Sequence, residues 1–228
     1  MSTAYYNEVD PYAAQWLRNL VAEGHIAGGD VDERSIVDVR ADDLRGYSQC
    51  HFFAGIAGWS VALRLAGWDD ARPVWTGSCP CQPLSGAARG RTIAQDLWPQ
   101  WCRLIAATRP RTLFGEQIPQ KGSWLDRVCD DLEVLGYEIG AAVLPAVAVG
   151  KDHARPRIYF VGNTNGNSQP IVPIDGKMAG LRRHRSDAGN MAPAHGVSAR
   201  VGRLRAYGNA IVAPLATEFI KAFMECAP

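Results

Sequence analysis

The sequence has 228 residues, of which 47% are hydrophobic and 21% charged, and these values predict one globular core with a small appended lobe. The six cysteines show neither the paired spacing of a zinc site nor a disulfide framework, so we expect no metal and a reducing, cytoplasmic environment. The longest apolar run, Ile139 to Val149, is too short to span a membrane, and the amino terminus shows no signal-peptide pattern. We therefore expect no membrane partner.

Charge is distributed unevenly along the chain, although the formal net charge is only +1. Residues 1–50 contain nine acidic and four basic residues, whereas residues 177–205 contain seven basic residues and one acidic residue. The basic segment is a candidate surface for phosphate groups. On charge alone, a solvated loop explains it equally well.

The first elements in chain order are a short apolar strand over residues 4–9 and a helix from Tyr12 to Val21. Asp10 and Pro11 between them are suited to cap and begin that helix. Glu8 therefore falls at the carboxyl end of a strand. In nucleotide-binding α/β sheets, an acidic residue at this place binds a ribose.

Two further strands are predicted at residues 25–31 and 47–53. The second is followed by a glycine-spaced turn at residues 54–58 and a helix over residues 59–66. Strand, glycine turn and helix together let the backbone approach a bound nucleotide closely.

A short strand at residues 73–77 leads into the sequence Ser78-Cys79-Pro80-Cys81. A cysteine that follows a proline in a loop after a buried strand can be an exposed, activated thiolate. A lone cysteine is more often a buried packing residue, so the neighbouring motifs have to decide between the two.

Beyond this loop the pattern predicts helices at residues 97–107 and 124–135 and strands at 112–117 and 139–145, and residues 153–161 lead into a further strand. Glu116 falls at the end of the first of these strands. Residues 163–202 show little periodicity. A final helix ends at Met224.

Residues 80–85 resemble the nucleophile loop of DNA cytosine-5 methyltransferases, which usually reads Pro-Cys-Gln-Pro-Phe-Ser. Residues 53–58 resemble the family's cofactor turn, usually Phe-Ala-Gly-Ile-Gly-Gly, with Ala57 in place of one glycine. Glu116 matches the acid of the family's Glu-Asn-Val motif, whereas Gln117 replaces the asparagine.

Two later motifs fit the same family. Arg155 and Arg157, before an apolar strand, resemble its arginine pair, and residues 208–211 resemble its closing Gly-Asn-Ala-Val. The resemblance implies an α/β fold: a Rossmann-like, mostly parallel sheet with helices on both faces, plus a small irregular lobe.

The order of the motifs is rearranged. In most relatives the Phe-Ala-Gly strand comes first, followed by the ribose acid and then by a Gly-Asp motif. Here residues 8–13 and 29–31 resemble the latter two and precede residues 53–58. We interpret this as a permutation, in which the Phe-Ala-Gly strand lies beside the two earlier strands. A truncated cofactor site with an unrelated amino terminus is the alternative.

The resemblance also implies a division of the chain and a set of functional residues. Residues 1–162 form the catalytic domain, 163–205 a reduced target-recognition lobe, and 206–228 a helix that returns to the catalytic domain. The expected catalytic residues are Cys81, Glu116, Arg155 and Arg157. The expected S-adenosyl-L-methionine site comprises Glu8, Asp30, Val31, Phe53, Ala54, Gly55, Ile56, Gly58 and Asn209. The expected substrate contacts are Pro80, Gln82, Ser85, Arg182, Arg183, Arg185 and Arg203.

The implied function is methyl transfer to carbon 5 of a flipped-out cytosine in double-stranded DNA, as in restriction-modification or phage enzymes. The alternatives are an RNA cytosine-5 methyltransferase and a catalytically weak DNA-binding remnant of the family. A nicotinamide oxidoreductase would also use a glycine turn but would not explain the Pro-Cys-Gln motif. The sequence leaves the recognition sequence and the oligomeric state open.

Overall fold

The computed structural model describes residues 3–80, 96–119, 124–149, 156–164 and 210–226. These residues form a seven-stranded sheet in the order β2-β1-β3-β4-β5-β7-β6. The strands are β1 (Ala4–Asn7), β2 (Gly29–Asp32), β3 (Gln49–Phe52), β4 (Val74–Gly77), β5 (Thr112–Gln117), β6 (Glu138–Leu144) and β7 (Arg157–Asn163). The first five neighbours pair in parallel, whereas β7 is antiparallel to both β5 and β6. The predicted fold class is confirmed.

The strand order also confirms the permutation. β1 lies between β2 and β3, and Ala4 is aligned with Gly29 on one side and Gln49 on the other. The chain that links β2 to β3 must therefore pass β1. It does so on the face that also carries α3, through the short 3-10 helix η1 (Ala41–Leu44).

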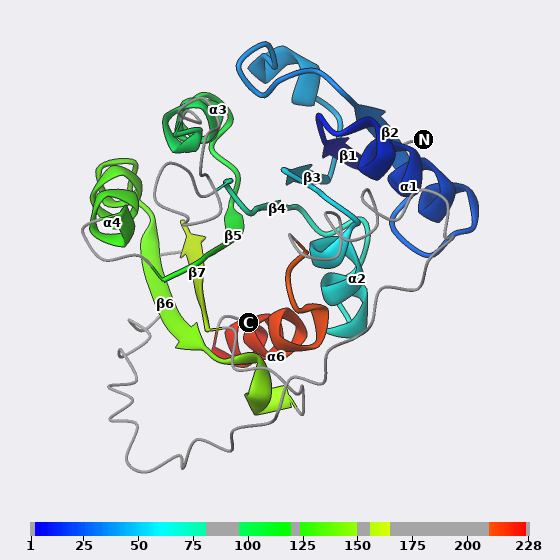
Figure 1. The fold of residues 1–228 in the computed structure, drawn as a ribbon. Coiled ribbons are helices and arrows are strands. Elements are labelled where there is room, and N and C mark those ends of the chain that lie inside the picture. Colours follow the sequence, from blue (N-terminus) through cyan, green and yellow to red (C-terminus); the bar gives the residue numbers. More distant parts are fainter. Residues whose placement is uncertain (1–2, 81–95, 120–123, 150–155, 165–209, 227–228) are drawn as a thin grey trace, which may run out of the picture.

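Helices cover both faces of the sheet (Figure 1). They are α1 (Pro11–Ala22), α2 (Gly58–Leu65), α3 (Trp98–Thr108), α4 (Trp124–Val134), α6 (Ala213–Cys226) and the 3-10 helix η2 (Ala146–Val149). α1, α2 and α6 lie on one face, and α3 and α4 on the other. Among the described residues, no helix is both long and apolar enough to cross a membrane.

The second strand begins later than the sequence pattern predicts, at Gly29 rather than His25. The reason is the end of α1, where His25 N donates to Leu20 O and Gly24 N donates to Val21 O. Gly24 has a φ of 70°, so these bonds form a Schellman motif that uses residues 23–25 to stop the helix.

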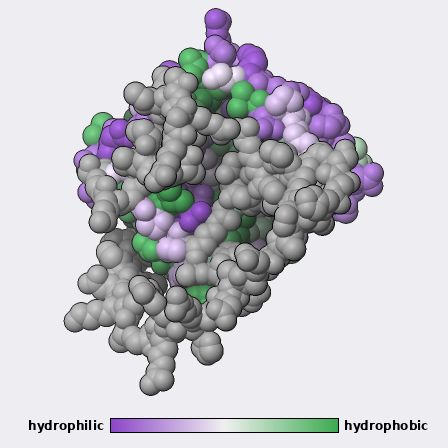
Figure 2. Space-filling model, in the orientation of Figure 1, coloured by the Kyte–Doolittle hydropathy of each residue, from purple (hydrophilic) through white to green (hydrophobic). Residues whose placement is uncertain are grey.

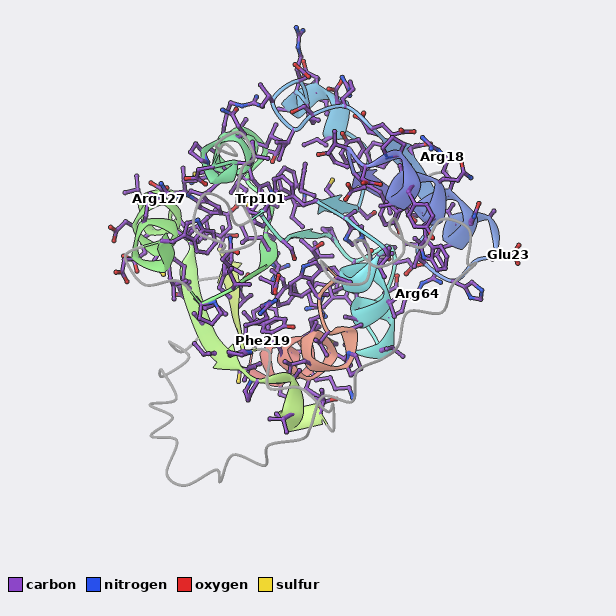
Figure 3. The ribbon with its side chains drawn as sticks, in the orientation of Figure 1. Arg18, Glu23, Arg64, Trp101, Arg127 and Phe219 are labelled. Carbon is purple, nitrogen blue, oxygen red and sulfur yellow. The ribbon has the colours of Figure 1, made fainter. Side chains whose placement is uncertain are left out.

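Aromatic side chains fill the core on both faces of the sheet. Trp101 of α3 packs near Phe52 and Phe160, whereas Phe219 of α6 packs on Phe114. Trp101 and Phe219 are labelled in Figure 3, on opposite faces.

Two strand glycines make room for these rings. A Cβ at Gly77 would lie 2.7 Å from the Trp101 ring, and one at Gly115 would lie 2.0 Å from the Phe160 ring. Gly115 stands directly before Glu116, and Gly77 begins the chain that leads to the expected nucleophile loop, so the packed rings and the ends of β4 and β5 are linked.

The amino-terminal part of the chain presents a charged surface. Glu33 and Asp42 are among its exposed acids, and Figure 2 shows mainly hydrophilic residues at the upper right, over this segment. The acidic start of the sequence is therefore accommodated on the outside of the fold.

A buried polar network lies where β3 meets β4. His51 is 2% exposed, with Nδ1 2.8 Å from Thr76 Oγ1 and Nε2 3.2 Å from Gln49 Oε1. Because Gln49 Oε1 can only accept, Nε2 carries the proton and the Thr76 hydroxyl donates to Nδ1. Burial lowers the pKa of His51 from its usual 6.5 to about 3.

This network predicts a loss of stability in mild acid. Below pH 6.5 the unfolded chain takes up a proton on His51 that the folded protein does not bind until about pH 3. The free energy of unfolding should therefore be lower at pH 5 than at pH 7 by about 2 kcal/mol from this residue. Urea unfolding at several pH values measures it. A His51→Gln variant should lose that part of the pH dependence, and an unchanged dependence would contradict the assignment.

Candidate functional site

The antiparallel direction of β7 brings the expected catalytic acid and one arginine together. β4 and β5 end at one edge of the sheet, called here the carboxyl edge, and β7 begins there. Glu116 is aligned with Tyr159 of β7, so Arg157, two residues earlier, points to the same face as Glu116.

Glu116 and Arg157 form a largely buried ion pair. Arg157 Nε lies 2.9 Å from Glu116 Oε1, and Glu116 is 8% exposed. A buried carboxylate requires such a partner, because burial of an isolated charge is costly. The pair therefore holds a carboxylate at the end of β5, beside the chain that leaves β4.

Two side chains hold the beginning of the expected nucleophile loop. Trp59 Nε1 donates to Ser78 Oγ at 3.0 Å, and Gln117 Nε2 donates to the Cys79 carbonyl oxygen at 3.1 Å. Gln117 is the residue that departs from the family's asparagine. Its amide also accepts from Ile118 N through Oε1 at 3.0 Å.

The described part of the loop contains one of its two cysteines, Cys79. Cys79 is 6% exposed, and burial raises the pKa of its thiol well above the usual value. A thiol in this state is not a ready nucleophile at neutral pH. Pro80, the next residue, is already exposed.

The expected cofactor turn has an unusual backbone. Phe53, Gly55 and Ala57 have φ values of 53°, 55° and 69°. For non-glycine residues this conformation costs roughly 1–2 kcal/mol each, and such strain is typical of ligand-binding segments. The methyl group of Ala57 packs in a buried cluster with Leu17 and Tyr6, which accounts for alanine at a position that favours glycine.

Glu8 connects this turn to the end of β1. Its Oε2 accepts from Gly55 N at 2.7 Å and its Oε1 accepts from Asp10 N at 2.9 Å. A carboxylate has about four acceptor positions, so it can also accept from ribose hydroxyls. A Cβ added at Gly55 would meet no atom within 4 Å, which leaves space over the turn. The remaining acceptor positions of Glu8 and the space over the turn fit the ribose of S-adenosyl-L-methionine.

The structure does not bring Asp30 and Val31 to the carboxyl edge. Asp30 lies opposite Tyr5, two residues before the end of β2, and its Oδ2 accepts from Tyr47 Oη at 2.7 Å. Val31 packs in the core on the α1 face. The register is set at Gly29, where any Cβ would lie 1.9 Å from the Ala4 carbonyl oxygen.

Asp32 is the acid that occupies the end of β2. Its carboxylate is bound by Tyr5 Oη at 2.6 Å and by Arg34 Nη2 at 2.7 Å. The sequence reasoning did not single out Asp32, Trp59 or Ser78. The alternation of acids in residues 30–32 is the one sequence signal that indicates Asp32. No local pattern indicates the Trp59–Ser78 bond.

Several expected site residues lie outside the described residues: Cys81, Gln82, Ser85, Arg155, Arg182, Arg183, Arg185, Arg203 and Asn209. Of the other expected cofactor residues, Ala54, Ile56 and Gly58 lie in the turn and at the start of α2. A Cβ at Gly58 would lie 2.6 Å from Ile211 Cγ1, so the chain before α6 packs closely against the turn. Within the described part, no group of three or more metal-ligating side chains is present.

Comparison with known proteins shows which family a segment of the chain resembles. Residues 73–181 match the model of the C-5 cytosine-specific DNA methylases. Over 103 residues the chain is 28% identical to the type II methyltransferase M.NgoMIV of Neisseria gonorrhoeae. The aligned stretch covers 42% of this chain and 33% of that protein. The chain thus spans about a third of the length of that curated relative.

One solved structure supports the fold. A mutant of Spodoptera frugiperda DNMT2 matches with a TM-score of 0.50 and 13% identity, over 75% of this chain and 45% of that one. The match to the Dnmt2 methyltransferase of S. pombe has a TM-score of 0.47 and 16% sequence identity, and it covers 74% of this chain and 42% of that one. The segment 73–181, which holds β4, Glu116 and Arg157, is thus similar to the C-5 cytosine-specific DNA methylases.

Proposed function

We propose that the protein is a DNA cytosine-5 methyltransferase that acts through a covalent bond between Cys81 and the target base. The observation that carries the proposal is the buried Glu116–Arg157 pair beside the segment 78–80, which leads directly to Cys81. The family whose model matches residues 73–181 takes its methyl group from S-adenosyl-L-methionine.

The role of Cys81 follows from the chemistry of the base. Carbon 5 of cytosine is a poor nucleophile, so a thiolate first adds to carbon 6 and turns the ring into an enamine. When bound, S-adenosyl-L-methionine would supply an electrophilic methyl group to carbon 5 and would leave as S-adenosylhomocysteine. A base then removes the proton from carbon 5, and the bond between carbon 6 and the cysteine sulfur breaks to restore the aromatic ring and the thiolate.

Glu116 and Arg157 hold the base during this addition. In the ion pair Glu116 is a carboxylate and can only accept, so it fits the 4-amino group of cytosine and a nitrogen 3 that has taken a proton from water. Charge that develops on the ring during thiolate attack is thereby compensated. Arg157 orients Glu116, and Arg155 is proposed to bind the base carbonyl or a nearby phosphate.

The cofactor site that we propose is formed by Glu8 and the strained turn at residues 53–58. Glu8 would accept from the ribose hydroxyls, and Phe53 would lie against the cofactor. We do not include Asp30 and Val31 in this proposed site, because they lie before the carboxyl end of β2. Asn209 stays a proposed contact, since the chain that follows it approaches Gly58 at Ile211.

The proposed substrate is duplex DNA with the cytosine turned out of the helix, because a stacked base cannot reach both Cys81 and Glu116. The basic lobe at residues 163–205 and the loop residues after Pro80 would contact the DNA. The return of residues 206–228 to the catalytic domain is supported by α6, which packs on Phe114 and Trp68.

A trapping experiment tests the covalent step. Duplex DNA of randomised sequence that contains 5-fluorocytosine, incubated with S-adenosyl-L-methionine, should give a stable protein–DNA adduct, because fluorine blocks proton loss from carbon 5. Cys81→Ser should abolish the adduct and methylation. Cys79→Ala should retain both, since Cys79 is a buried thiol. An adduct that maps to Cys79 would overturn the nucleophile assignment.

The same experiment separates the alternatives. RNA transcripts that contain 5-fluorocytidine form the second arm, and an adduct with RNA alone would favour an RNA methyltransferase. DNA binding without an adduct in either arm would favour a catalytically inactive member of the family.

The Trp59–Ser78 bond predicts a further effect on the rate. Trp59 stands at the start of α2, stacks on Phe114 and meets Tyr159 edge-on. Trp59→Phe keeps an aromatic ring there but removes the N–H that holds Ser78. One such bond contributes about 1 kcal/mol, so the rate of single-turnover methylation should fall roughly fivefold.

A double-mutant cycle distinguishes loss of the Trp59–Ser78 hydrogen bond from loss of packing. Ser78→Ala should slow methylation to a similar extent, and the double variant should be no slower than either single variant. Trp68→Phe is the matched control, because it removes an indole bond to Arg72 O away from the carboxyl edge. Additive losses, or an equal loss in the control, would show that Trp59 contributes only to packing.

A further inference from the structure

A hollow lies at the opposite edge of the sheet from the candidate active site. Its volume is about 500 Å³, and it is lined by residues of three segments, 41–48, 73–75 and 107–111. These segments precede or begin the neighbouring parallel strands β3, β4 and β5. The hollow is therefore at the amino edge, separated from the carboxyl edge by the length of a four-residue strand, about 13 Å.

Positive charge dominates the lining of this hollow. Arg45, Arg109 and Arg111 contribute to it, and Asp42 is the acid that lines it. Asp42 pairs with Arg45 at 2.8 Å, but both side chains are largely exposed, so this ion pair is weak and can exchange partners. Within the described part of the chain, the guanidinium groups of Arg109 and Arg111 make no ion pair or hydrogen bond.

The backbone that carries these two arginines is firmly placed. Arg109 ends α3 in the left-handed conformation, with φ 54°, and its N–H donates to Ile105 O at 2.8 Å. Tyr137 Oη donates to Pro110 O at 2.7 Å, and Thr164 N donates to Arg111 O at 3.0 Å. Arginines at a helix end often bind its last carbonyls, but here neither guanidinium does so, which leaves both available to a ligand.

A further arginine, Arg72, lies near this hollow. Burial, and after it the like charge of Arg111, lowers the pKa of Arg72, whose guanidinium lies 3.8 Å from the centre of the Trp68 ring. Arg72 precedes Pro73, one of the lining residues. Several cations with few acids are the arrangement that attracts a multiply charged anion.

Apolar groups complete the walls. Leu44, Pro73 and Trp75 line the hollow beside the arginines, and a volume of this size accommodates a small organic ligand. Arginine pairs bind phosphate oxygens in a two-pronged geometry. From these features we propose that the hollow at the amino edge binds the phosphate groups of a nucleotide unit through Arg109 and Arg111, with its organic part against the apolar wall.

Direct binding tests this inference without reference to methylation. ADP is titrated into the full-length protein in the presence of excess S-adenosylhomocysteine, so that the adenosine-type site proposed at the carboxyl edge is filled. A second arm uses a 12-nucleotide single strand of DNA, which offers phosphodiesters instead of a free diphosphate. Binding of ADP with a dissociation constant below about 1 mM identifies a free nucleotide as the ligand. Binding of the strand alone identifies nucleic acid.

Charge-removing variants assign the bound phosphate to the hollow. Arg109→Gln combined with Arg111→Gln should weaken binding at least tenfold. Arg18→Gln, an exposed arginine on α1 (Figure 3), is the matched control and should leave binding unchanged. S-adenosylhomocysteine affinity should be equal in all three proteins, which excludes misfolding of the variants. Unchanged binding in the double variant, or no binding of either probe to the unaltered protein, would overturn the proposal.

Discussion

The carboxylate of Glu8 joins two strand ends that are 47 residues apart in the chain. It accepts from Gly55 N at the turn after β3 and from Asp10 N at the start of α1, while Glu8 N donates to Asp32 O after β2. Three neighbouring strand ends are thus tied at one residue. The cofactor turn, the helix α2 that follows it and the Trp59–Ser78 bond all take their positions from this junction.

The permuted order has a simple physical explanation. A parallel sheet requires each strand to lie beside its partners in the correct direction, but it does not require the chain to make them in a fixed order. β1 occupies the same kind of place between β2 and β3 whether it is made before or after β3, provided that the connecting segment is long enough to pass it. Residues 33–48 supply that length, and η1 buries Leu44 against the α3 face on the way.

The part of the fold that the sequence predicted is the part with local signals. The apolar runs, the Asp10-Pro11 helix start and the glycine turn were sufficient for most elements. The family resemblance, not a local signal, placed the Phe-Ala-Gly strand beside the two earlier strands. The position of Asp30 could not be predicted, because it depends on how closely Gly29 approaches Ala4 from another strand. The hydrogen bonds from Trp59 and Gln117 to the loop after β4 could not be predicted either, because they join residues that are 19 and 38 positions apart in the chain. The family resemblance identified Glu116 and Arg157, but only the antiparallel register of β7 explains why they meet.

The most direct test of the account concerns Glu8, because the rearranged amino terminus is held to complete the cofactor site. Isothermal titration of S-adenosylhomocysteine should show at least a tenfold loss of affinity in Glu8→Gln, since bonds to a charged group contribute about 1.5–3 kcal/mol. Glu23→Gln, an exposed acid at the far end of α1 (Figure 3), should bind as the unaltered protein does. Equal affinity in the Glu8 variant, with its thermal unfolding unchanged, would contradict the claim that this strand end forms part of the site.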